Sequence, residues 1–338
     1  MSDHTTDGTA QVAREYVGEP YGLPFALPAR VRVNEVGPRD GFQLEQVMIP
    51  TPTKVEIVDA LSRTGVHGVQ VTSFVRPDAV PQLQDGAEVM RAMTRQPGVT
   101  YAVLVPNLKG AERALEHGAQ VWETMLSVSD AHSRANANRD TESALAGMHD
   151  VVALARQHGV EVAGGMATAL GCPFEGRVPY DRVAWVTSTY QDMGVRHVTV
   201  ADTAGVADPA HVYGTMSRLR SDFPDITFAL HLHDTRGLGM ANVMAGMAAG
   251  VVDFDASVGG LGGCPFAPGA TGNIATEDLV HMLALLGVDT GVDLDALVAV
   301  SRDLVAPAID HPLESSLSRA DPSWSLHPSP AAQVLDPR

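Results

Sequence analysis

The sequence predicts an α/β fold, a (β/α)8 TIM barrel with a short C-terminal helical extension. Short apolar runs and amphipathic segments of helical period alternate eight times between residues 31 and 286, and strands separated by helices pair in parallel. Eight such units fit a closed barrel better than an open flavodoxin-like or dinucleotide-binding sheet. In addition, no predicted strand is followed by the phosphate-binding patterns GxGxxG, GxxxxGKS or GxxxxGKT that such open sheets carry.

The predicted strands are short apolar runs. They span residues 31–36, 68–74, 99–105, 120–127, 160–167, 196–201, 226–232 and 252–257. Each is followed by a predicted helix, and these helices span residues 53–64, 81–95, 108–117, 140–158, 180–193, 208–221, 238–249 and 275–286. Thr51-Pro52 and Asp208-Pro209 support two helix starts, because each pair places a capping side chain and a proline where a helix begins.

The chain divides into three predicted parts. Residues 1–28 form an N-terminal arm, residues 29–290 the TIM-barrel catalytic domain, and residues 291–338 a C-terminal helix and a proline-rich tail. The helix of this last part is expected over residues 290–305, and six prolines follow within residues 306–338.

Charge and composition exclude several classes of protein. The 40 acidic residues outnumber the 23 basic ones, and the net charge of −17 argues against nucleic acid as a partner. No run approaches the roughly 20 apolar residues of a membrane span, and the polar N-terminus lacks the pattern of a signal peptide. We therefore expect a cytoplasmic protein without a membrane partner. Its two cysteines, Cys172 and Cys264, form no CxxC pair, which argues against structural zinc and a disulfide framework.

Polar side chains collect where the predicted strands end, and four of them suggest a metal site. His231 and His233 are two residues apart on the seventh strand, so both imidazoles face the same side. In a closed barrel the eighth strand lies beside the seventh and the first, so Asp40 and Asn273 can converge with them. One carboxylate, one amide oxygen and two imidazoles favour a six-coordinate divalent cation, Mg²⁺ or Mn²⁺, although Zn²⁺ or Co²⁺ could substitute.

Three further features near these strand ends allow two readings each. Arg39, beside the predicted ligand Asp40, either forms an internal salt bridge to Glu35 or Asp202 or stabilises a developing enolate oxygen. Cys264 lies in a loop with four glycines and is either a small buried side chain or an acid/base group on a lid. The segment 130–139 reads as a solvated polar loop, although its two arginines could bind phosphate. Cys172 is expected to be structural.

Seven motifs resemble those of one family. They are E-V-G-P-R-D-G-x-Q (35–43), T-S-F-V-x-P (72–77), P-N-L-K-G (106–110), A-L-G-C-P (169–173), D-T-x-G (202–205), H-x-H-D-T (231–235) and G-L-G-G-C-P-x-A-x-G-A-x-G-N-x-A-T-E-D-L-V (260–280). Together they resemble the 3-hydroxy-3-methylglutaryl-CoA lyases, within the metal-dependent barrel lyases and Claisen condensing enzymes. The resemblance implies a divalent cation, cleavage of an acyl-CoA to acetyl-CoA and acetoacetate, and a homodimer.

The resemblance also implies roles for individual residues. It implies metal ligands at Asp40, His231, His233 and Asn273, catalytic roles for Arg39 and Cys264, and substrate positioning by Ser73 and Thr203. We add Gln43 and Gln70 as substrate-binding residues. Two features depart from the family, which usually has glutamate where this chain has Gln70 and often has basic residues after the barrel where this chain has the acidic segment 308–319. The acyl group or its carrier could therefore differ.

The predicted reaction is a retro-Claisen cleavage. His233 or Asp202 would accept the proton of the substrate hydroxyl, Arg39 would stabilise the thioester enolate, and Cys264 would protonate its carbon. Alternatives are a lyase for citramalyl-CoA or a longer-branched glutaryl-CoA, a Claisen-type condensing synthase, and a Schiff-base aldolase using Lys109. A non-catalytic binding barrel is disfavoured, because all four predicted ligands, Arg39 and Cys264 are present.

Overall fold

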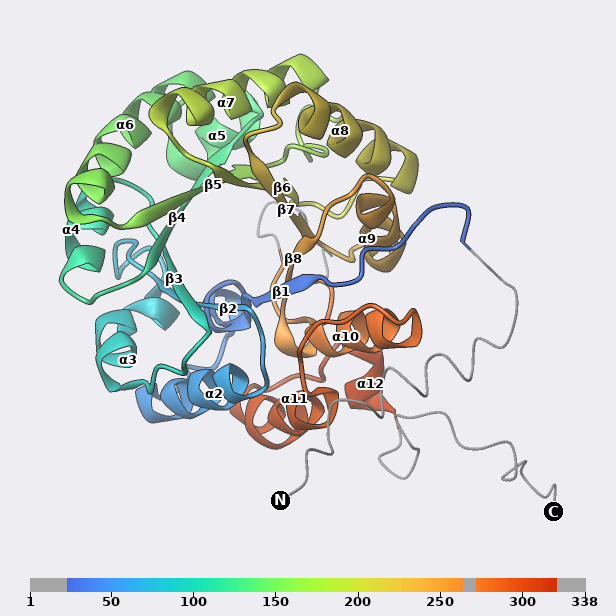
Figure 1. Cartoon of the computed structure of the whole chain (residues 1–338). Helices are drawn as coiled ribbons and strands as arrows, with labels where there is room; N and C mark the ends of the chain where they lie inside the picture. The colour runs from blue at the N-terminus through green and yellow to red at the C-terminus, as the bar shows by residue number, and fades with distance from the viewer. Residues whose placement is uncertain (1–22, 264–271, 321–338) are drawn as a thin grey trace.

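The closed barrel predicted from the sequence is confirmed. The computed structural model describes residues 23–263 and 272–320. Eight parallel strands follow one another around the barrel in sequence order. They are β1 (Arg32–Glu35), β2 (Gly68–Ser73), β3 (Thr100–Leu104), β4 (Val121–Ser127), β5 (Glu161–Ala167), β6 (His197–Asp202), β7 (Thr227–Leu232) and β8 (Asp253–Ala256). The pairing of β1 with β8 closes the ring (Figure 1).

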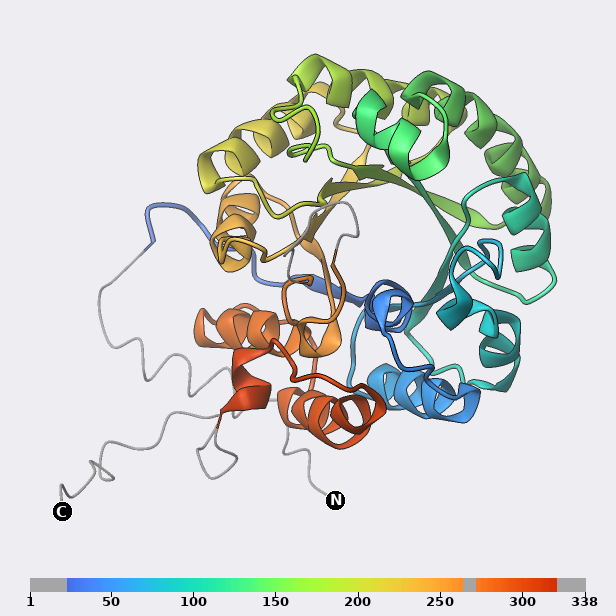
Figure 2. The same ribbon diagram turned by 180° about the vertical axis from the view of Figure 1, so that it is seen from behind.

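A helix follows each strand and lies outside the barrel (Figures 1 and 2). These helices are α2 (Thr51–Arg63), α3 (Gly86–Ala92), α4 (Leu108–Leu115), α6 (Thr141–His158), α7 (Tyr180–Met193), α8 (Pro209–Asp222), α9 (Gly239–Ala248) and α10 (Thr276–Leu285). The predicted helix 81–95 was too long, because a separate 3-10 turn, η3 (Pro81–Leu83), precedes α3. At Gly86 the chain lies directly against the strand, since a Cβ there would approach the Thr72 hydroxyl to 2.3 Å.

The interpretation of residues 130–139 as a solvated loop was wrong, because Asp130–Ala137 forms helix α5. The hydroxyl of Ser129 accepts the backbone N–H of His132 and so caps the start of this helix. Asn138, in the left-handed conformation, ends it. The segment is polar, yet His132 is buried, so the helix does have an inner face.

The C-terminal extension completes the outer ring of helices. Helix α11 (Leu294–Val300) continues into the π-helical turn η5 (Ser301–Val305), and the short α12 (Ser316–Arg319) follows. Helix α11 lies between α10 and α2 (Figure 1). The buried Glu277 of α10 accepts the Gly259 N–H and the Ser318 hydroxyl. These bonds tie the extension to the segment that follows β8.

Alternation along the strands separates an apolar outer shell from a polar interior. In β7, Phe228, Leu230 and Leu232 are buried on the helix side, whereas Ala229 and His231 face the inside of the barrel. The methyl groups of Leu230 lie against Gly246 of α9. Inward-facing positions in such barrels are usually filled by bulky branched residues. Here polar residues such as His231 and Asp255 take inward-facing positions, and small residues such as Ala229 leave a cavity at the amino-terminal ends of the strands.

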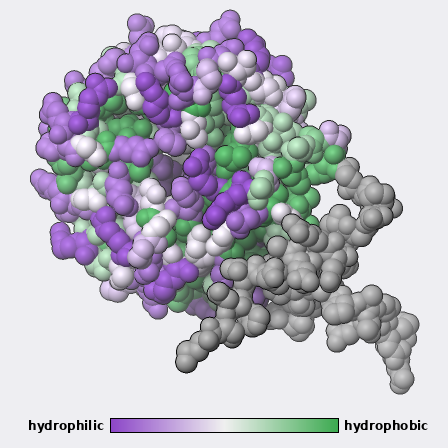
Figure 3. All heavy atoms as spheres, viewed as in Figure 1, coloured by the Kyte–Doolittle hydropathy of each residue, from purple (hydrophilic) through white to green (hydrophobic). Residues whose placement is uncertain are grey.

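The face viewed in Figure 1 carries mainly hydrophilic side chains (Figure 3). Across residues 23–263 and 272–320, no helix is both long enough and apolar enough to cross a membrane.

The contact between α9 and β7 gives a test of the fold. Gly246→Ala is expected to lower the melting temperature, because the added Cβ would lie 2.4 Å from Cδ1 of the fully buried Leu230. Overpacking of this kind destabilises a fold by about 1–3 kcal/mol. This loss is larger than the roughly 1 kcal/mol by which alanine stabilises a helix relative to glycine. Thermal unfolding followed by circular dichroism measures the change.

Gly214→Ala in α8 is the matched control, since nothing lies within 4 Å of a Cβ at Gly214. This variant should melt at a higher temperature than the unmodified protein. Equal stability of the two alanine variants would contradict the packing described for α9.

Candidate active site

Three side chains that could hold a metal ion meet at the carboxyl ends of the strands. His231 is in β7 and His233 follows this strand directly, while Asp40 lies in η1 (Gly37–Gly41), the π-helical turn after β1. All three are buried, and their candidate ligand atoms lie within 4.8 Å of one another. The two Nε2 atoms are 3.2 Å apart. Asp40 Oδ2 is 3.8 Å from the Nε2 of His231 and 4.0 Å from that of His233.

Asn273 joins this cluster from the segment after β8. A β-bridge pairs it with His233, and its Nδ2 donates to Asp40 Oδ2 at 2.8 Å and to the Leu261 carbonyl at 3.0 Å. Its Oδ1 is buried without a hydrogen-bond partner among the described residues. Turning this amide by 180° would place a second oxygen beside Asp40, an arrangement that a cation stabilises. The structure therefore brings together all four predicted ligands.

The charges around the cluster keep Asp40 and His233 free of protons at neutral pH, whereas they favour protonation of His231. Burial alone would raise the pKa of Asp40, but Arg39 and the two imidazoles lower it to about 2. Burial, and then the neighbouring His231, lower the pKa of His233 to about 4. Burial opposes protonation of His231 as well, yet its hydrogen bond to Asp255 and the charge of Asp40 outweigh this effect and raise its pKa.

The donor set and its spacing fit a divalent cation. Ligands at about 2.1 Å from an octahedral ion are roughly 3 Å apart when adjacent, close to the 3.2 Å between the imidazole nitrogens. Asp255 lies 3.3 Å from Nδ1 of His231. A carboxylate that accepts this N–H leaves the lone pair on Nε2, facing the cluster, as in the carboxylate–histidine pairs of metal sites.

Arg39 makes neither of the internal salt bridges considered from the sequence. Its buried guanidinium donates through Nη1 to Asp40 and through Nε to Gln70. Glu35 instead accepts hydrogen bonds from Gly37 N, Val258 N and the Thr276 hydroxyl. The positively charged guanidinium of Arg39 therefore lies beside the predicted metal ligands.

Glu35 connects the turn that carries Asp40 with the segment after β8. Its three hydrogen bonds are 2.6–2.9 Å long and reach Gly37 on one side and Val258 and Thr276 on the other. Burial raises the pKa of this carboxyl to about 8. Glu35 is thus a bridge that holds the two sides of the site together.

The predicted substrate-binding residues occupy different positions around the site. Gln43 donates from Nε2 to Asp40 Oδ1 at 2.9 Å and so orients the predicted ligand. The buried Ser73 ends β2, and its hydroxyl accepts the Val75 N–H. Thr203 follows β6, and its hydroxyl accepts the Thr168 N–H at 2.8 Å. Gln70 lies inside the barrel, where its side-chain oxygen accepts a hydrogen bond from Arg39.

Asp202, a candidate base, is occupied by hydrogen bonds to the backbone. Asp202 ends β6, and its two oxygens accept the N–H groups of Val206 and Ala207 at 2.9 and 3.0 Å. Burial raises the pKa of Asp202.

The two cysteines differ in what the structure shows. Cys172 is buried, with its sulfur 2.9 Å from the Ser129 hydroxyl, as a structural residue would be. Cys264 lies outside the described residues.

Sequence reasoning missed two carboxyl groups inside the barrel, Asp255 of β8 and Glu123 of β4. Asp255 holds His231, and Glu123 accepts a hydrogen bond from Gln70. Burial, and then the charge of Asp255, raise the pKa of Glu123 to about 7. A signal was present in each strand, because the acidic residue falls on the inward phase of the two-residue period.

Comparison with known proteins agrees with this geometry. The HMGL-like family model matches residues 30–304. The mitochondrial hydroxymethylglutaryl-CoA lyase of Gallus gallus is 41% identical over 295 residues, which cover 87% of this chain and 99% of that protein. The 3-hydroxy-3-isohexenylglutaryl-CoA/hydroxy-methylglutaryl-CoA lyase of Pseudomonas aeruginosa is 43% identical over 83% of this chain and 93% of its own length.

A solved structure shows the same likeness in three dimensions. The HMG-CoA lyase of Acinetobacter baumannii, solved in complex with coenzyme A and 3-methylmalate, is 42% identical with a TM-score of 0.84. The alignment covers 89% of this chain and 98% of that one. The chain therefore belongs to the HMGL-like family, as its motifs predicted.

Proposed function

We propose that this protein is a divalent-metal-dependent carbon–carbon lyase that cleaves 3-hydroxy-3-methylglutaryl-CoA to acetyl-CoA and acetoacetate. The observation that carries the proposal is the convergence of Asp40, His231, His233 and Asn273 beside the buried Arg39. The named activity of relatives about 40% identical over most of the chain supports it. The relatives' names favour cleavage over the condensing alternative. Lys109 is exposed at the start of α4, whereas the cluster is buried.

Asp40, His231, His233 and Asn273 would hold the cation. Oxygen and imidazole donors without a thiolate favour Mg²⁺ or Mn²⁺. When bound, a divalent cation supplies Lewis acidity, which lowers the pKa of a substrate hydroxyl and polarises a carbonyl oxygen.

Arg39 would stabilise the charge that cleavage creates. Breaking the carbon–carbon bond leaves a ketone and the enolate of a thioester, and the negative oxygen of this enolate requires a fixed donor. The Arg39 guanidinium is buried, and its Nε and Nη1 are held by Gln70 and Asp40. The remaining hydrogens of this side chain can donate to the enolate oxygen without reorientation.

We favour His233 over Asp202 as the acceptor of the hydroxyl proton. Both oxygens of Asp202 accept backbone hydrogens and hold the turn after β6. His233 is within the cluster, and with a pKa of about 4 its ring is neutral at pH 7, as a base must be. Protonation at Nε2 would remove His233 from the ligand set, so this role requires the other three ligands to retain the ion.

Cys264 is the proposed proton donor to the enolate carbon. Its own position lies outside the described residues, but Gly262, two residues earlier, lies at the cluster. A Cβ at Gly262 would be 2.6 Å from Asn273 Nδ2 and 3.3 Å from Asp40 Oδ2. The chain that leads to Cys264 therefore passes directly beside the predicted ligands.

The activity prediction concerns Arg39. With Mn²⁺ present, the protein is expected to release acetyl-CoA and acetoacetate from 3-hydroxy-3-methylglutaryl-CoA, and Arg39→Met should lower kcat by about 100- to 1,000-fold, as expected when one donor to an oxyanion is lost. A coupled assay for acetyl-CoA measures the activity of the unmodified protein and the change in kcat of the variant. Arg196→Met, which changes an exposed arginine just before β6, is the control.

The same assay with citramalyl-CoA and longer-branched 3-hydroxyglutaryl-CoA substrates tests the acyl group. Preference for one of these would replace the proposed substrate, and an Arg39→Met enzyme as active as Arg196→Met would remove Arg39 from the mechanism.

Metal affinity should depend on pH through His231. Because the pKa of His231 is raised, protons compete with the cation as the pH falls through the neutral range, whereas Asp40 and His233, with values of about 2 and 4, stay unprotonated. Mn²⁺ affinity from calorimetry should therefore decrease from pH 8 to pH 5. Asp255→Asn weakens the hydrogen bond and removes one of the two negative charges that raise the pKa of His231, so it should move this decrease to lower pH.

Asp253→Asn is the control, since Asp253 is paired with Arg32 instead of His231. An affinity that is constant from pH 8 to pH 5, or an Asp255→Asn profile equal to that of Asp253→Asn, would contradict this assignment.

Cys264→Ala should separate metal binding from turnover. The variant is expected to bind Mn²⁺ as the unmodified protein does and to lose acetyl-CoA release, because the thiol is a proposed proton donor and no ligand. Cys172→Ala is the matched cysteine control and should retain turnover. Unchanged kinetics of Cys264→Ala would exclude the thiol from the reaction.

A further inference from the structure

Arg39 is held by a chain of two hydrogen bonds that runs through the interior of the barrel. Its Nε donates to Oε1 of Gln70 on β2, and Nε2 of Gln70 donates to Oε2 of Glu123 on β4. Gln70 and Arg39 are only 2% and 5% exposed. The three side chains therefore form one connected series that ends at the site.

The chemistry of the two ends fixes the amide between them. A guanidinium only donates hydrogen bonds and an ionised carboxylate only accepts them, so Gln70 must present its oxygen to Arg39 and its nitrogen to Glu123. If the group at position 123 could also donate, the amide could turn and present its own hydrogens to the guanidinium. The charge of Glu123 therefore determines whether Arg39 keeps its acceptor.

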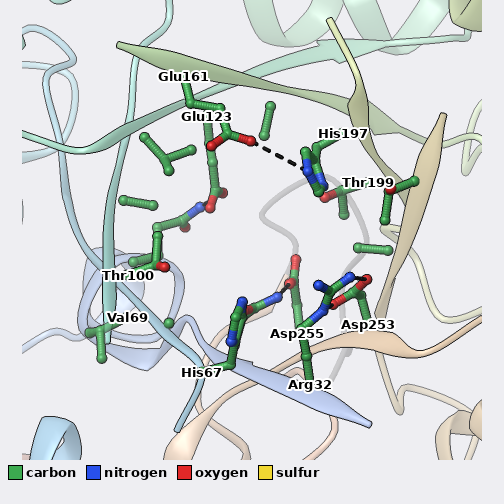
Figure 4. Close-up of a pocket in the computed structure, with 18 of the residues that line it drawn as sticks. Arg32, His67, Val69, Thr100, Glu123, Glu161, His197, Thr199, Asp253 and Asp255 are labelled. Carbon is green, nitrogen blue, oxygen red and sulfur yellow. Dashed lines mark hydrogen bonds and ion pairs between the residues drawn. The ribbon is translucent and has the colours of Figure 1, made fainter. Parts of the chain in front are cut away.

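Glu123 reaches water on the side of the barrel opposite the predicted ligands. A cavity of about 240 Å³ lies at the amino-terminal ends of the strands, since the first residue of all eight strands lines it. Glu123 and Asp255 point into it from different sides of the barrel (Figure 4). Small side chains such as Ala102, Ala163 and Ala229 leave this space open.

Access to water lowers the cost of a charge on Glu123. Its pKa is about 7, because burial and the charges of Asp255 and Asp40 raise it while Arg39 and His231 lower it. At pH 8 the carboxyl is therefore mostly ionised and able to hold the amide.

We propose that Glu123 is a positioning residue for the cleavage reaction, which fixes Arg39 through the amide of Gln70. This inference rests on the proposed function for its effect on turnover, but the geometry it invokes exists with or without that activity.

The kinetic test compares three variants at pH 8. Glu123→Gln should lower kcat roughly 10- to 100-fold, the usual effect of losing a residue that orients a catalytic group, with KM nearly unchanged. The double variant Gln70→Glu/Glu123→Gln should recover most of the lost kcat, because a carboxylate at position 70 accepts directly from Arg39. Glu161→Gln is the matched control, since Glu161 lines the same cavity but pairs with His197 at 3.4 Å.

A second readout does not depend on activity. In protein labelled with ¹⁵N-arginine, the Nε–H resonance of Arg39, assigned with Arg39→Lys, should shift in Glu123→Gln and stay in place in Glu161→Gln. Gln70→Leu, which removes the link and leaves the carboxyl, should shift it as well and lower kcat, so the test holds even if Glu123→Gln does not fold.

These measurements separate the two proposals. If the unmodified protein releases no acetyl-CoA from any acyl-CoA tested, the proposed function fails, and the Arg39 resonance still decides the role of Glu123. An unshifted resonance in Glu123→Gln or in Gln70→Leu would overturn the positioning role, as would a loss of kcat that the double variant does not reverse.

Discussion

The closure of the sheet between β1 and β8 is the constraint on which the site depends. Asp40 follows the first strand and Asn273 follows the last, yet their side chains are 2.8 Å apart because β1 pairs with β8. β7, the other neighbour of β8, contains His231 and leads directly into His233. Glu35 strengthens the same junction from inside, since it accepts hydrogen bonds from both sides. An open sheet of the same strands would leave these groups on opposite edges.

Closure also creates an interior where charges interact strongly. Asp40, Glu123 and Asp255 act on one another inside the barrel, and the charge of Arg39 lowers the pKa of both Asp40 and Glu123. Burial raises the pKa of Glu123, while Asp40 keeps its charge because Arg39 and two imidazoles lie beside it. A divalent cation held by the four proposed ligands would add positive charge beside these carboxylates.

Much of this architecture could be predicted from the sequence because it depends on local patterns. The hydrophobic periodicity of strands and helices predicted the eight strand–helix units. The two-residue spacing of His231 and His233 predicted that both side chains face the same side. The helix α5 was missed because its capping residues and its buried His132 are hidden in a polar segment. The partners of Arg39 could not be predicted, because Gln70 and Glu123 come from β2 and β4 and meet only through side-chain conformations. No strand pattern specifies such a contact.

The most direct test of the metal centre is pulsed electron paramagnetic resonance of the protein loaded with Mn²⁺. Electron spin echo modulation detects nitrogen atoms bound to the ion, and we expect coupling to two imidazole nitrogens. His231→Gln and His233→Gln should each leave one coupled nitrogen. A spectrum without imidazole coupling, or one that neither substitution changes, would contradict the convergence of these side chains on one cation.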